Sequence, residues 1–262
     1  MELIENQREE IFCLKYELNT LSELLIHDCA ERWVYNFMYK SVENDHLERY
    51  NFVLKYVHNK NVLDIACGSG YGTFLISTKG VANKVVGVDI SENAIRYGNH
   101  RYSAPNISRL LGDACEIKFN EKFDIIVSFE TIEHVQNYDL FVKNLYENLT
   151  KDGILVISTP IVSSTTVNPK NPYHLIEWDV KDFRNLFKGK FEIKEALLQN
   201  PIFHIRKSTY LLKVFNKIVR ILGLNLELKT EISHKNIVKD IGQYNLKNCV
   251  SGYQILVLKK II

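Results

Sequence analysis

Between residues 61 and 159, short apolar segments alternate with segments long enough to form helices, and this alternation constrains the fold more than any other feature. The helix-length segments are Gly72–Lys79, Glu92–His100 and Tyr138–Leu149. The apolar segments are Asn61–Ala66, Lys84–Asp89, Arg109–Gly112, Phe123–Phe129 and Ile154–Thr159. Strands that alternate with helices are typical of a parallel, doubly wound sheet, and nearly continuous apolar strands indicate that both faces of the sheet are covered. We therefore predict an α/β fold.

The flanking segments predict helical additions to this sheet. Residues 1–60 are expected to be helical, because Ile4, Ile11, Leu14, Leu18, Leu21 and Leu25 repeat mostly in steps of three and four. The stripe fits a helix packed on its own domain, and it also fits a short coiled-coil dimer. Phe191–Leu198 and Tyr253–Leu258 are two later candidate strands, and an insertion separates them. Its Ser208–Leu222 stretch is basic and amphipathic, which predicts a cap or a subunit contact and leaves peripheral membrane contact open.

We accordingly divide the chain into a helical cap at 1–60, a core at 61–199 plus 250–262, and an inserted helical segment at 200–249 that caps the acceptor or joins subunits. The 33 Lys and Arg residues face 31 Asp and Glu residues, so DNA binding is not expected and RNA binding is not favoured. Five cysteines without a CxxC pair indicate neither a zinc site nor a disulfide framework. With no signal-peptide pattern and no apolar run of about 18 residues, we expect a cytoplasmic protein without a transmembrane segment.

A glycine-rich turn follows the first apolar segment and indicates a nucleotide site. Gly68, Gly70 and Gly72 let the backbone approach a ligand, and the helix that follows presents its N-terminus to an anionic group. Asp89 ends the second segment 21 residues after Gly68, an offset at which an acidic residue accepts ribose hydroxyls. The third glycine comes one residue earlier than in a dinucleotide fingerprint, and Asp64 would repel a pyrophosphate but attract an amino group. A nucleoside with a methionine tail fits better than a dinucleotide.

Four ordered motifs resemble those of class I S-adenosylmethionine-dependent methyltransferases. VLDIACGSGYGT (Val62–Thr73) and VVGVDIS (Val85–Ser91) are similar to the first two, Gly112–Ala114 to the third, and FDIIVSFETIEHV (Phe123–Val135) to the fourth. The resemblance spans residues 61–198 and the last strand. It implies S-adenosylmethionine as cofactor and a Rossmann-like, seven-stranded, mostly parallel sheet whose last strand is antiparallel.

The resemblance also assigns roles to individual residues. Asp64 and the turn at Ala66, Gly68, Gly70 and Tyr71 would hold the methionine part of the cofactor. Asp89 would bind the ribose, and Ile90 would pack on the adenine. Asp113 would accept the adenine amino group beside the N–H of Ala114, and Phe129 and Glu130 would line the sulfonium side.

Two carboxylates and two imidazoles predict an acceptor site. Glu130, Glu133 and His134 are spaced i, i+3, i+4, which would place them on one face of a helical turn at the carboxyl end of the sheet. A later loop carries His174 and could fold over the same crevice. These four residues suit Mn²⁺, Fe²⁺ or Zn²⁺, and Mg²⁺ less well. The E-x-x-E-H pattern resembles the metal motif of ubiquinone-biosynthesis O-methyltransferases and small-RNA terminal 2′-O-methyltransferases. The other histidines, including His46, are expected to be structural or surface residues.

A metal chelated by a vicinal diol would lower the pKa of the attacking hydroxyl, with Glu133, His134 and His174 as the catalytic groups. A metal-free site with His134 or His174 as general base remains an alternative, as do carboxylates that merely favour a helix N-terminus. The segments Ala30–Trp33 and His46–Phe52 resemble those preceding the first motif in bacterial surface-glycan methyltransferases. We therefore expect O-methylation of a sugar hydroxyl on a glycan, a glycolipid or a nucleotide sugar. The alternatives are a small-molecule, quinol-type or RNA O- or N-methyltransferase and a non-catalytic cofactor-binding subunit, and a homo-oligomer stays open.

Overall fold

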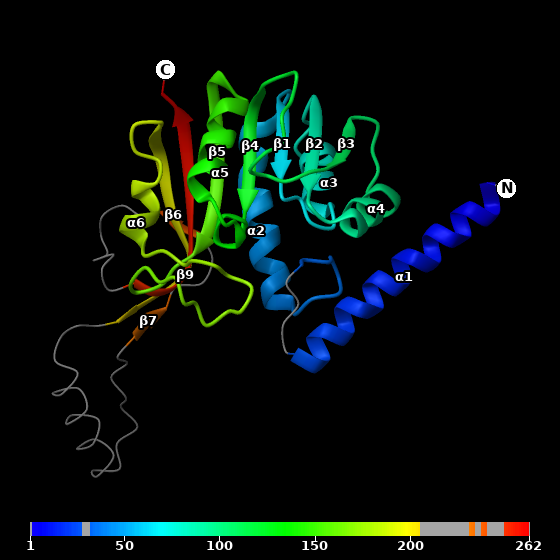
Figure 1. Ribbon diagram of the computed structural model, residues 1–262, viewed down its shortest axis with the longest axis horizontal. Helices are drawn as coiled ribbons and strands as arrows, with labels where there is room; N and C mark the ends of the chain where they lie inside the picture. Colours follow the sequence, from blue (N-terminus) through cyan, green and yellow to red (C-terminus); the bar gives the residue numbers. More distant parts are fainter. Residues whose placement is uncertain (1, 28–31, 205–230, 234–236, 240–248, 262) are drawn as a thin grey trace, which may run out of the picture.

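A mixed β-sheet forms the centre of the protein (Figure 1). The computed structural model describes residues 2–27, 32–204, 231–233, 237–239 and 249–261. In these residues the strand order is β3-β2-β1-β4-β5-β9-β6-β7, and β8 pairs with β6. The seven principal strands are β1 (Asn61–Ile65), β2 (Lys84–Asp89), β3 (Ile107–Leu111), β4 (Phe123–Phe129), β5 (Leu149–Pro160), β6 (Phe191–His204) and β9 (Cys249–Lys260).

The strand directions are those that the sequence predicts. β1 pairs in parallel with β2 and β4, β2 with β3, and β4 with β5, whereas β9 is antiparallel to both β5 and β6. The seven-stranded, mostly parallel sheet with an antiparallel last strand is therefore confirmed. The chain order reverses between β1 and β4, and in such sheets ligands bind at this switch point, beyond the carboxyl ends of the strands.

The helices of the described residues are α1 (Glu2–His27), α2 (Lys40–Val57), α3 (Tyr71–Thr78), α4 (Glu92–Arg101), α5 (Tyr138–Asn148) and α6 (Val180–Asn185), with a short 3₁₀ helix, η1, at Ile132–His134. Except for α1, which packs on α4, the α-helices cover the two faces of the sheet (Figure 1). Because side chains alternate along a strand, Leu63 of β1 joins a core cluster with α5 and α6, whereas Val62 joins a cluster with α2 and α3. No helix in the described part of the chain is long and apolar enough to cross a membrane.

The N-terminal region agrees with the sequence prediction of helices, whereas the described part of the 200–249 insertion does not. The N-terminal region is helical as expected, and α1 packs one of its faces on α4. The predicted helix at Ser208–Leu222 lies outside the described residues. The described part of the 200–249 insertion forms strands instead: it contains the end of β6, β7 (Glu231–Ser233), β8 (Ile237–Lys239) and the first residue of β9. Since β7 and β8 both pair with β6, this part of the insertion extends the sheet.

Candidate active site

The turn after β1 has the backbone shape of a nucleotide site. Ala66, Gly68 and Gly70 all have left-handed backbone, with φ of 60°, 55° and 86°. The Gly68 N–H donates to Asp89 Oδ2 at 2.9 Å, which joins the turn to the end of β2. Helix α3 begins at Tyr71, immediately after the turn, so its N-terminal N–H groups lie at the same edge of the sheet.

Asp64 lies beneath this turn, outside the cavity wall described below. Its side chain is 1% exposed, and its Oδ2 accepts a hydrogen bond from the Thr73 hydroxyl at 2.7 Å. The Tyr50 hydroxyl of α2 lies 3.1 Å from Oδ1 and donates to it. Burial raises the pKa of Asp64 to about 6, although both hydrogen bonds act in the opposite direction. A cationic amino group bound nearby would favour the ionised carboxylate again.

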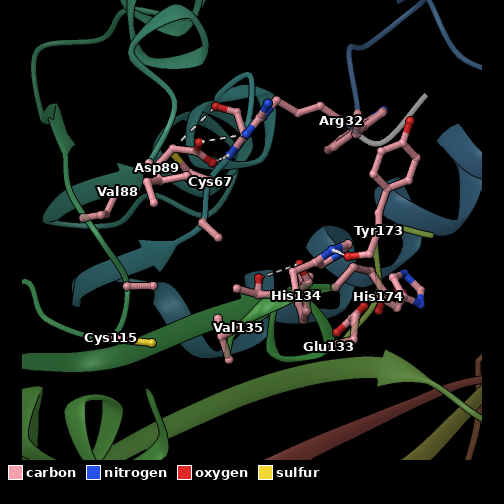
Figure 2. A pocket seen from close by; sticks show the side chains of 18 of the residues that line it. Arg32, Cys67, Val88, Asp89, Cys115, Glu133, His134, Val135, Tyr173 and His174 are labelled. Carbon is pink, nitrogen blue, oxygen red and sulfur yellow. Dashed lines mark hydrogen bonds and ion pairs between the residues drawn. The ribbon is translucent and has the colours of Figure 1, made fainter. Parts of the chain in front are cut away.

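Asp89 ends β2 and lies in the wall of a cavity. Its Oδ1 accepts from the Ser91 N–H at 2.9 Å. The same oxygen accepts from the guanidinium of Arg32 at 3.3 Å (Figure 2). With the bond from Gly68, three hydrogen bonds reach a carboxylate that offers about four acceptor positions. Asp89 thus keeps capacity for a ribose hydroxyl. Arg32 is a contact that the sequence motifs did not predict.

The cavity has a volume of about 730 Å³ and contains residues of both predicted halves of the site. On the cofactor side, its wall includes Ala66, Gly68, Asp89, Ile90, Asp113, Ala114, Phe129 and Glu130. On the acceptor side it includes Glu133, His134 and His174. Tyr71 is directed elsewhere, since its ring stacks on Tyr35 with centroids 3.8 Å apart. Such a volume is typical of a small-molecule site.

Glu133 is the most unusual group in this cavity. Its side chain is fully buried, and its Oε2 accepts from the Thr159 hydroxyl at 3.1 Å, but its Oε1 has no hydrogen-bond partner. Burial raises the pKa of Glu133 well above its usual value, and the nearby charge of Glu130 raises it further. A buried carboxylate oxygen without a partner is costly, so this position is suited to bind a cation or to hold a proton.

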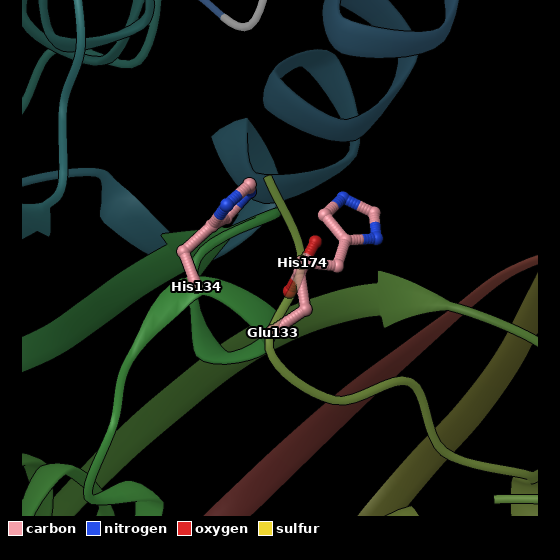
Figure 3. A group of neighbouring side chains, drawn as sticks. All are labelled: Glu133, His134 and His174. Carbon is pink, nitrogen blue, oxygen red and sulfur yellow. The ribbon is translucent and has the colours of Figure 1, made fainter. Parts of the chain in front are cut away.

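Two imidazoles lie beside Glu133 (Figure 3). One candidate ligand atom from each of Glu133, His134 and His174 lies within 4.8 Å of the other two. His134 is the last residue of η1, which follows β4. His174 comes from the loop before α6. The loop therefore folds over the crevice as the sequence suggested.

The hydrogen bonds of the two rings define which nitrogens carry protons. His134 Nδ1 lies 2.9 Å from the Tyr173 carbonyl oxygen, and because a carbonyl only accepts, this nitrogen is the donor. His174 Nδ1 lies 2.6 Å from Glu177 Oε1, and its Nε2 lies 2.9 Å from the Asn171 amide nitrogen. Nδ1 of His174 therefore donates to Glu177, and its Nε2 accepts.

Glu130 is not part of this cluster. Its Oε1 accepts from the Ser158 hydroxyl at 2.6 Å, and its backbone is left-handed, with φ of 51°. The sequence prediction assumed a helical turn that starts at Glu130, but η1 begins only at Ile132. The structure thus brings together three of the four predicted metal ligands and leaves Glu130 in the cavity wall.

Several cavity residues were given no individual role in the sequence analysis. Arg32, His46 and Arg49 come from the two segments that resemble surface-glycan methyltransferases, whereas Tyr173 comes from the loop before α6 and Tyr253 from β9. His46, grouped with the structural and surface histidines above, stacks on Trp33 with centroids 4.9 Å apart, and burial lowers its pKa well below its usual value. These residues come from four separate segments of the chain, so only the tertiary fold brings them to one cavity.

The sequence profile of a methyltransferase domain family matches residues 57–218, more than half of the chain. The chain belongs to this family. A probable S-adenosylmethionine-dependent methyltransferase of Mycolicibacterium smegmatis is 30% identical over 150 residues, covering 55% of this chain and 56% of that protein. Methyltransferase membership and the predicted class I fold are therefore confirmed.

Two further relatives carry more specific names. A malonyl-[acyl-carrier protein] O-methyltransferase of Acetivibrio thermocellus is 29% identical over 99 residues, covering 38% of this chain and 35% of that protein. A ubiquinone biosynthesis O-methyltransferase of Rickettsia canadensis is 31% identical over 101 residues, covering 37% and 42%. The chain therefore matches about half, or less, of the length of these relatives.

Solved structures support the fold. The N-methyltransferase NodS from Bradyrhizobium japonicum, in complex with S-adenosyl-L-homocysteine, aligns with a TM-score of 0.58 over 93% of this chain and 100% of that one. The two sequences are 13% identical, so this likeness concerns the fold alone.

Proposed function

We propose that this methyltransferase uses S-adenosylmethionine to O-methylate a sugar hydroxyl on a glycan, a glycolipid or a nucleotide sugar. The observation that carries the proposal is the position of Glu133. Its buried, unpartnered carboxylate oxygen lies beside two imidazoles, in the same cavity as the ribose-binding candidate Asp89. A hydroxyl becomes a good nucleophile only when its proton leaves, and this end of the cavity has groups that promote that loss.

The cofactor end of the cavity fits S-adenosylmethionine. Asp89 has acceptor capacity for a ribose hydroxyl, and the left-handed turn at Gly68 lets the backbone approach a ligand closely. Asp113 is fixed by the Cys115 N–H, which donates to its Oδ1 at 2.7 Å, so its carboxylate is oriented in the cavity wall. When bound, the cofactor supplies a methyl group on a sulfonium.

The acceptor end fits a divalent cation held by Glu133, His134 and His174. The cation would take the place of the Asn171 amide at His174 Nε2. One carboxylate oxygen and two imidazole nitrogens suit Mn²⁺, Fe²⁺ or Zn²⁺ better than Mg²⁺. The Tyr173 carbonyl and the Glu177 carboxylate each accept the Nδ1 proton of one ring, and metal-binding histidines are usually oriented in this way. A cation in this position would lower the pKa of a hydroxyl in a vicinal diol.

The same residues support a second candidate mechanism without a metal. Because Nδ1 of His134 is the protonated nitrogen, its Nε2 is the basic nitrogen that can accept the proton of the acceptor hydroxyl. The Tyr173 carbonyl then stabilises the imidazolium that forms. This mechanism applies equally to a quinol-type acceptor.

An acceptor scan tests the proposal. The protein is incubated with methyl-labelled S-adenosylmethionine and a panel of sugars, sugar phosphates and nucleotide sugars, with and without Mn²⁺, beside catechol and short RNA. Base-stable label in a sugar product, increased by Mn²⁺, is the expected result. Transfer only to catechol or RNA would contradict the sugar acceptor. Tight cofactor binding without transfer to any acceptor would favour a regulatory subunit instead.

A further inference from the structure

A buried arginine lies at the acceptor end of the cavity with only neutral partners in the described part of the chain. Arg49 of α2 is 1% exposed and belongs to the cavity wall. Its Nη1 donates to Gln199 Oε1 at 2.6 Å, and its guanidinium carbon lies 4.8 Å from the centroid of the Tyr253 ring. Its Nε has no hydrogen-bond partner. A buried guanidinium whose direct contacts are an amide and an aromatic face is costly, because no ion pair replaces its hydration.

Two carboxylates, Asp45 and Glu133, have a pKa that burial raises and that the nearby charge of Arg49 lowers in part, but each is hydrogen-bonded to another partner. Asp45 Oδ1 accepts from the Asn200 amide at 2.7 Å, and Glu133 accepts from Thr159. Neither of these carboxylates forms an ion pair with Arg49 in the described residues.

The surroundings hold Arg49 firmly in this position. Gln199 lies opposite Tyr253 in the β6–β9 register, so both contacts come from one rung of the sheet. The Gln199 Nε2 donates to the Asp45 carbonyl at 3.0 Å and to Glu48 Oε2 at 2.8 Å, which directs its oxygen to Arg49. A fixed guanidinium fork is suited to the planar oxygens of a carboxylate or to a phosphate.

We propose that Arg49 binds an anionic group of the acceptor, a carboxylate or a phosphate. This proposal rests on the proposed function and narrows it: the methylated sugar is an acidic one, such as a uronic acid or a sugar phosphate. Arg49 then determines specificity, since it holds the acid group while the neighbouring hydroxyl faces Glu133, His134 and His174.

Calorimetry on the protein saturated with S-adenosylhomocysteine tests this site. The probes are D-glucuronate, its uncharged methyl ester, glucose 1-phosphate and D-glucose. We expect the unaltered protein to bind glucuronate or glucose 1-phosphate at least about tenfold more tightly than the uncharged sugars. Whether glucuronate or glucose 1-phosphate binds more tightly identifies the acid group. No acid binding, or equal binding of glucuronate and its ester, would overturn the proposal without any variant.

Variants then assign the preference to Arg49. Arg49→Gln should lose the preference for acidic over uncharged sugars, whereas Arg49→Lys should keep part of this preference. Arg101→Gln is the matched control, because Arg101 pairs with Glu10 and Glu17 of α1 and is absent from the cavity wall. Unchanged S-adenosylhomocysteine affinity verifies that each variant is folded. An unchanged preference in folded Arg49→Gln would overturn the proposal. If the protein binds acidic sugars through Arg49 but does not methylate them, the result supports the role of Arg49 and contradicts only the proposed function.

A different observation concerns the N-terminal helix. One face of α1 packs on α4, where Glu9 pairs with Arg96 and Glu10 with Arg101. The apolar stripe lies on the other side: Ile4, Ile11, Leu14, Leu18 and Leu21 are 37 to 64% exposed. Figure 1 places α1 at the edge of the molecule, so this stripe is accessible.

The spacing of the stripe matches a two-stranded coiled coil. Ile4, Ile11 and Leu18 are seven residues apart, and Leu14 and Leu21 form the second series of the same heptad. The first series has isoleucine at two of its three positions, and the second has leucine at two of three, with Gln7 at the remaining one. Isoleucine in the first series and leucine in the second favour a parallel dimer. The flanks carry opposite charge, with Arg8 and Lys15 exposed on one side and Glu10, which also pairs with Arg101 of α4, on the other.

We infer that α1 pairs with α1 of a second copy of this chain. Sedimentation equilibrium at about 1 to 100 µM should show a dimer for the unaltered protein. Leu14→Glu/Leu18→Glu should shift it to a monomer with unchanged S-adenosylhomocysteine binding, because both side chains are exposed. Asn6→Glu/Asn19→Glu, on exposed positions outside the stripe, is the control and should remain dimeric. A monomeric unaltered protein, or a dimer that persists in the leucine variant, would overturn the inference.

Discussion

The imidazole of His174 meets that of His134 edge to face, with ring centroids 4.8 Å apart. His134 follows β4, and His174 belongs to the loop before α6, so the contact closes one side of the cavity. Glu133 lies buried beside both rings with one oxygen unpartnered. Because these three side chains lie together in the cavity, we regard them as the candidate groups that remove the proton of the acceptor hydroxyl.

Glu177→Gln tests the support of the metal site. The Glu177 carboxylate orients His174 through a 2.6 Å hydrogen bond, so its loss should weaken Mn²⁺ binding by about 10- to 100-fold. Affinity for S-adenosylhomocysteine should not change. Calorimetric titration of both ligands measures this, with Glu192→Gln, on an exposed part of β6, as control. Equal Mn²⁺ affinity in both variants would contradict a supporting role for Glu177.

Asp64 should make cofactor affinity depend on pH. In the cofactor-free protein its pKa is raised to about 6 by burial, and we propose that the amino group of the cofactor binds near it and favours the ionised carboxylate. Affinity for S-adenosylhomocysteine should therefore rise with pH up to about 6 and level off above it. Asp64→Asn should weaken binding and flatten this dependence. A profile that remains unchanged in the variant would assign the titration to another group.

The same pKa has a consequence for stability. Because the folded pKa of Asp64 exceeds the unfolded value of 3.8, the folded protein binds more protons between about pH 4 and 6. The contribution of Asp64 to the free energy of unfolding should thus fall as pH rises through that window. Urea denaturation of the cofactor-free protein at pH 4.5 and 6.5, compared with Asp64→Asn, isolates this contribution. The variant should lack it.

Gly72→Ala should destabilise the protein. A Cβ on Gly72 would lie 1.9 Å from an atom of the Tyr50 ring, whose hydroxyl binds Asp64. Such overpacking costs about 1–3 kcal/mol or more. Gly189→Ala is the control, because Gly189 has a left-handed φ of 77° but no atom within 4 Å, so only backbone strain of about 1 kcal/mol is expected. Urea denaturation compares the two, and only Gly72→Ala should also weaken cofactor binding.

Asp89 should contribute far more to cofactor affinity than its partner Arg32. Asp89→Ala removes the proposed ribose acceptor and leaves the N–H groups of Gly68 and Ser91 without their partner, so binding should weaken about 10- to 150-fold. Arg32→Gln removes a partly exposed ion pair and should change affinity less than about threefold. If the two variants lost similar affinity, Arg32 would have to contact the cofactor.

The strand arrangement could be predicted from the sequence because it depends on local patterns of apolar residues and turns. The bounds of β2 and β4 are those of the apolar segments, and the glycine turn and Asp89 meet through a hydrogen bond, as their offset suggests. These features depend on neighbouring residues or on the regular crossover of one strand to the next.

The remainder of the site could not be predicted because it depends on tertiary contacts. Glu130 was predicted to share a face with Glu133, but its left-handed backbone at the end of β4 turns it toward Ser158. Arg49 and Tyr253 are far apart in the chain and meet only where α2 crosses the end of β9. No spacing rule connects such residues.

The most direct test is a calorimetric Mn²⁺ titration of the protein saturated with S-adenosylhomocysteine, beside Glu133→Ala/His134→Ala. Glu192→Ala/His58→Ala, which changes two exposed residues outside the cavity wall, is the matched control. We predict one-site binding by the unaltered protein and the control, and its loss in the variant. Absence of Mn²⁺ binding by the unaltered protein, or binding that the variant retains, would contradict a metal site at Glu133, His134 and His174.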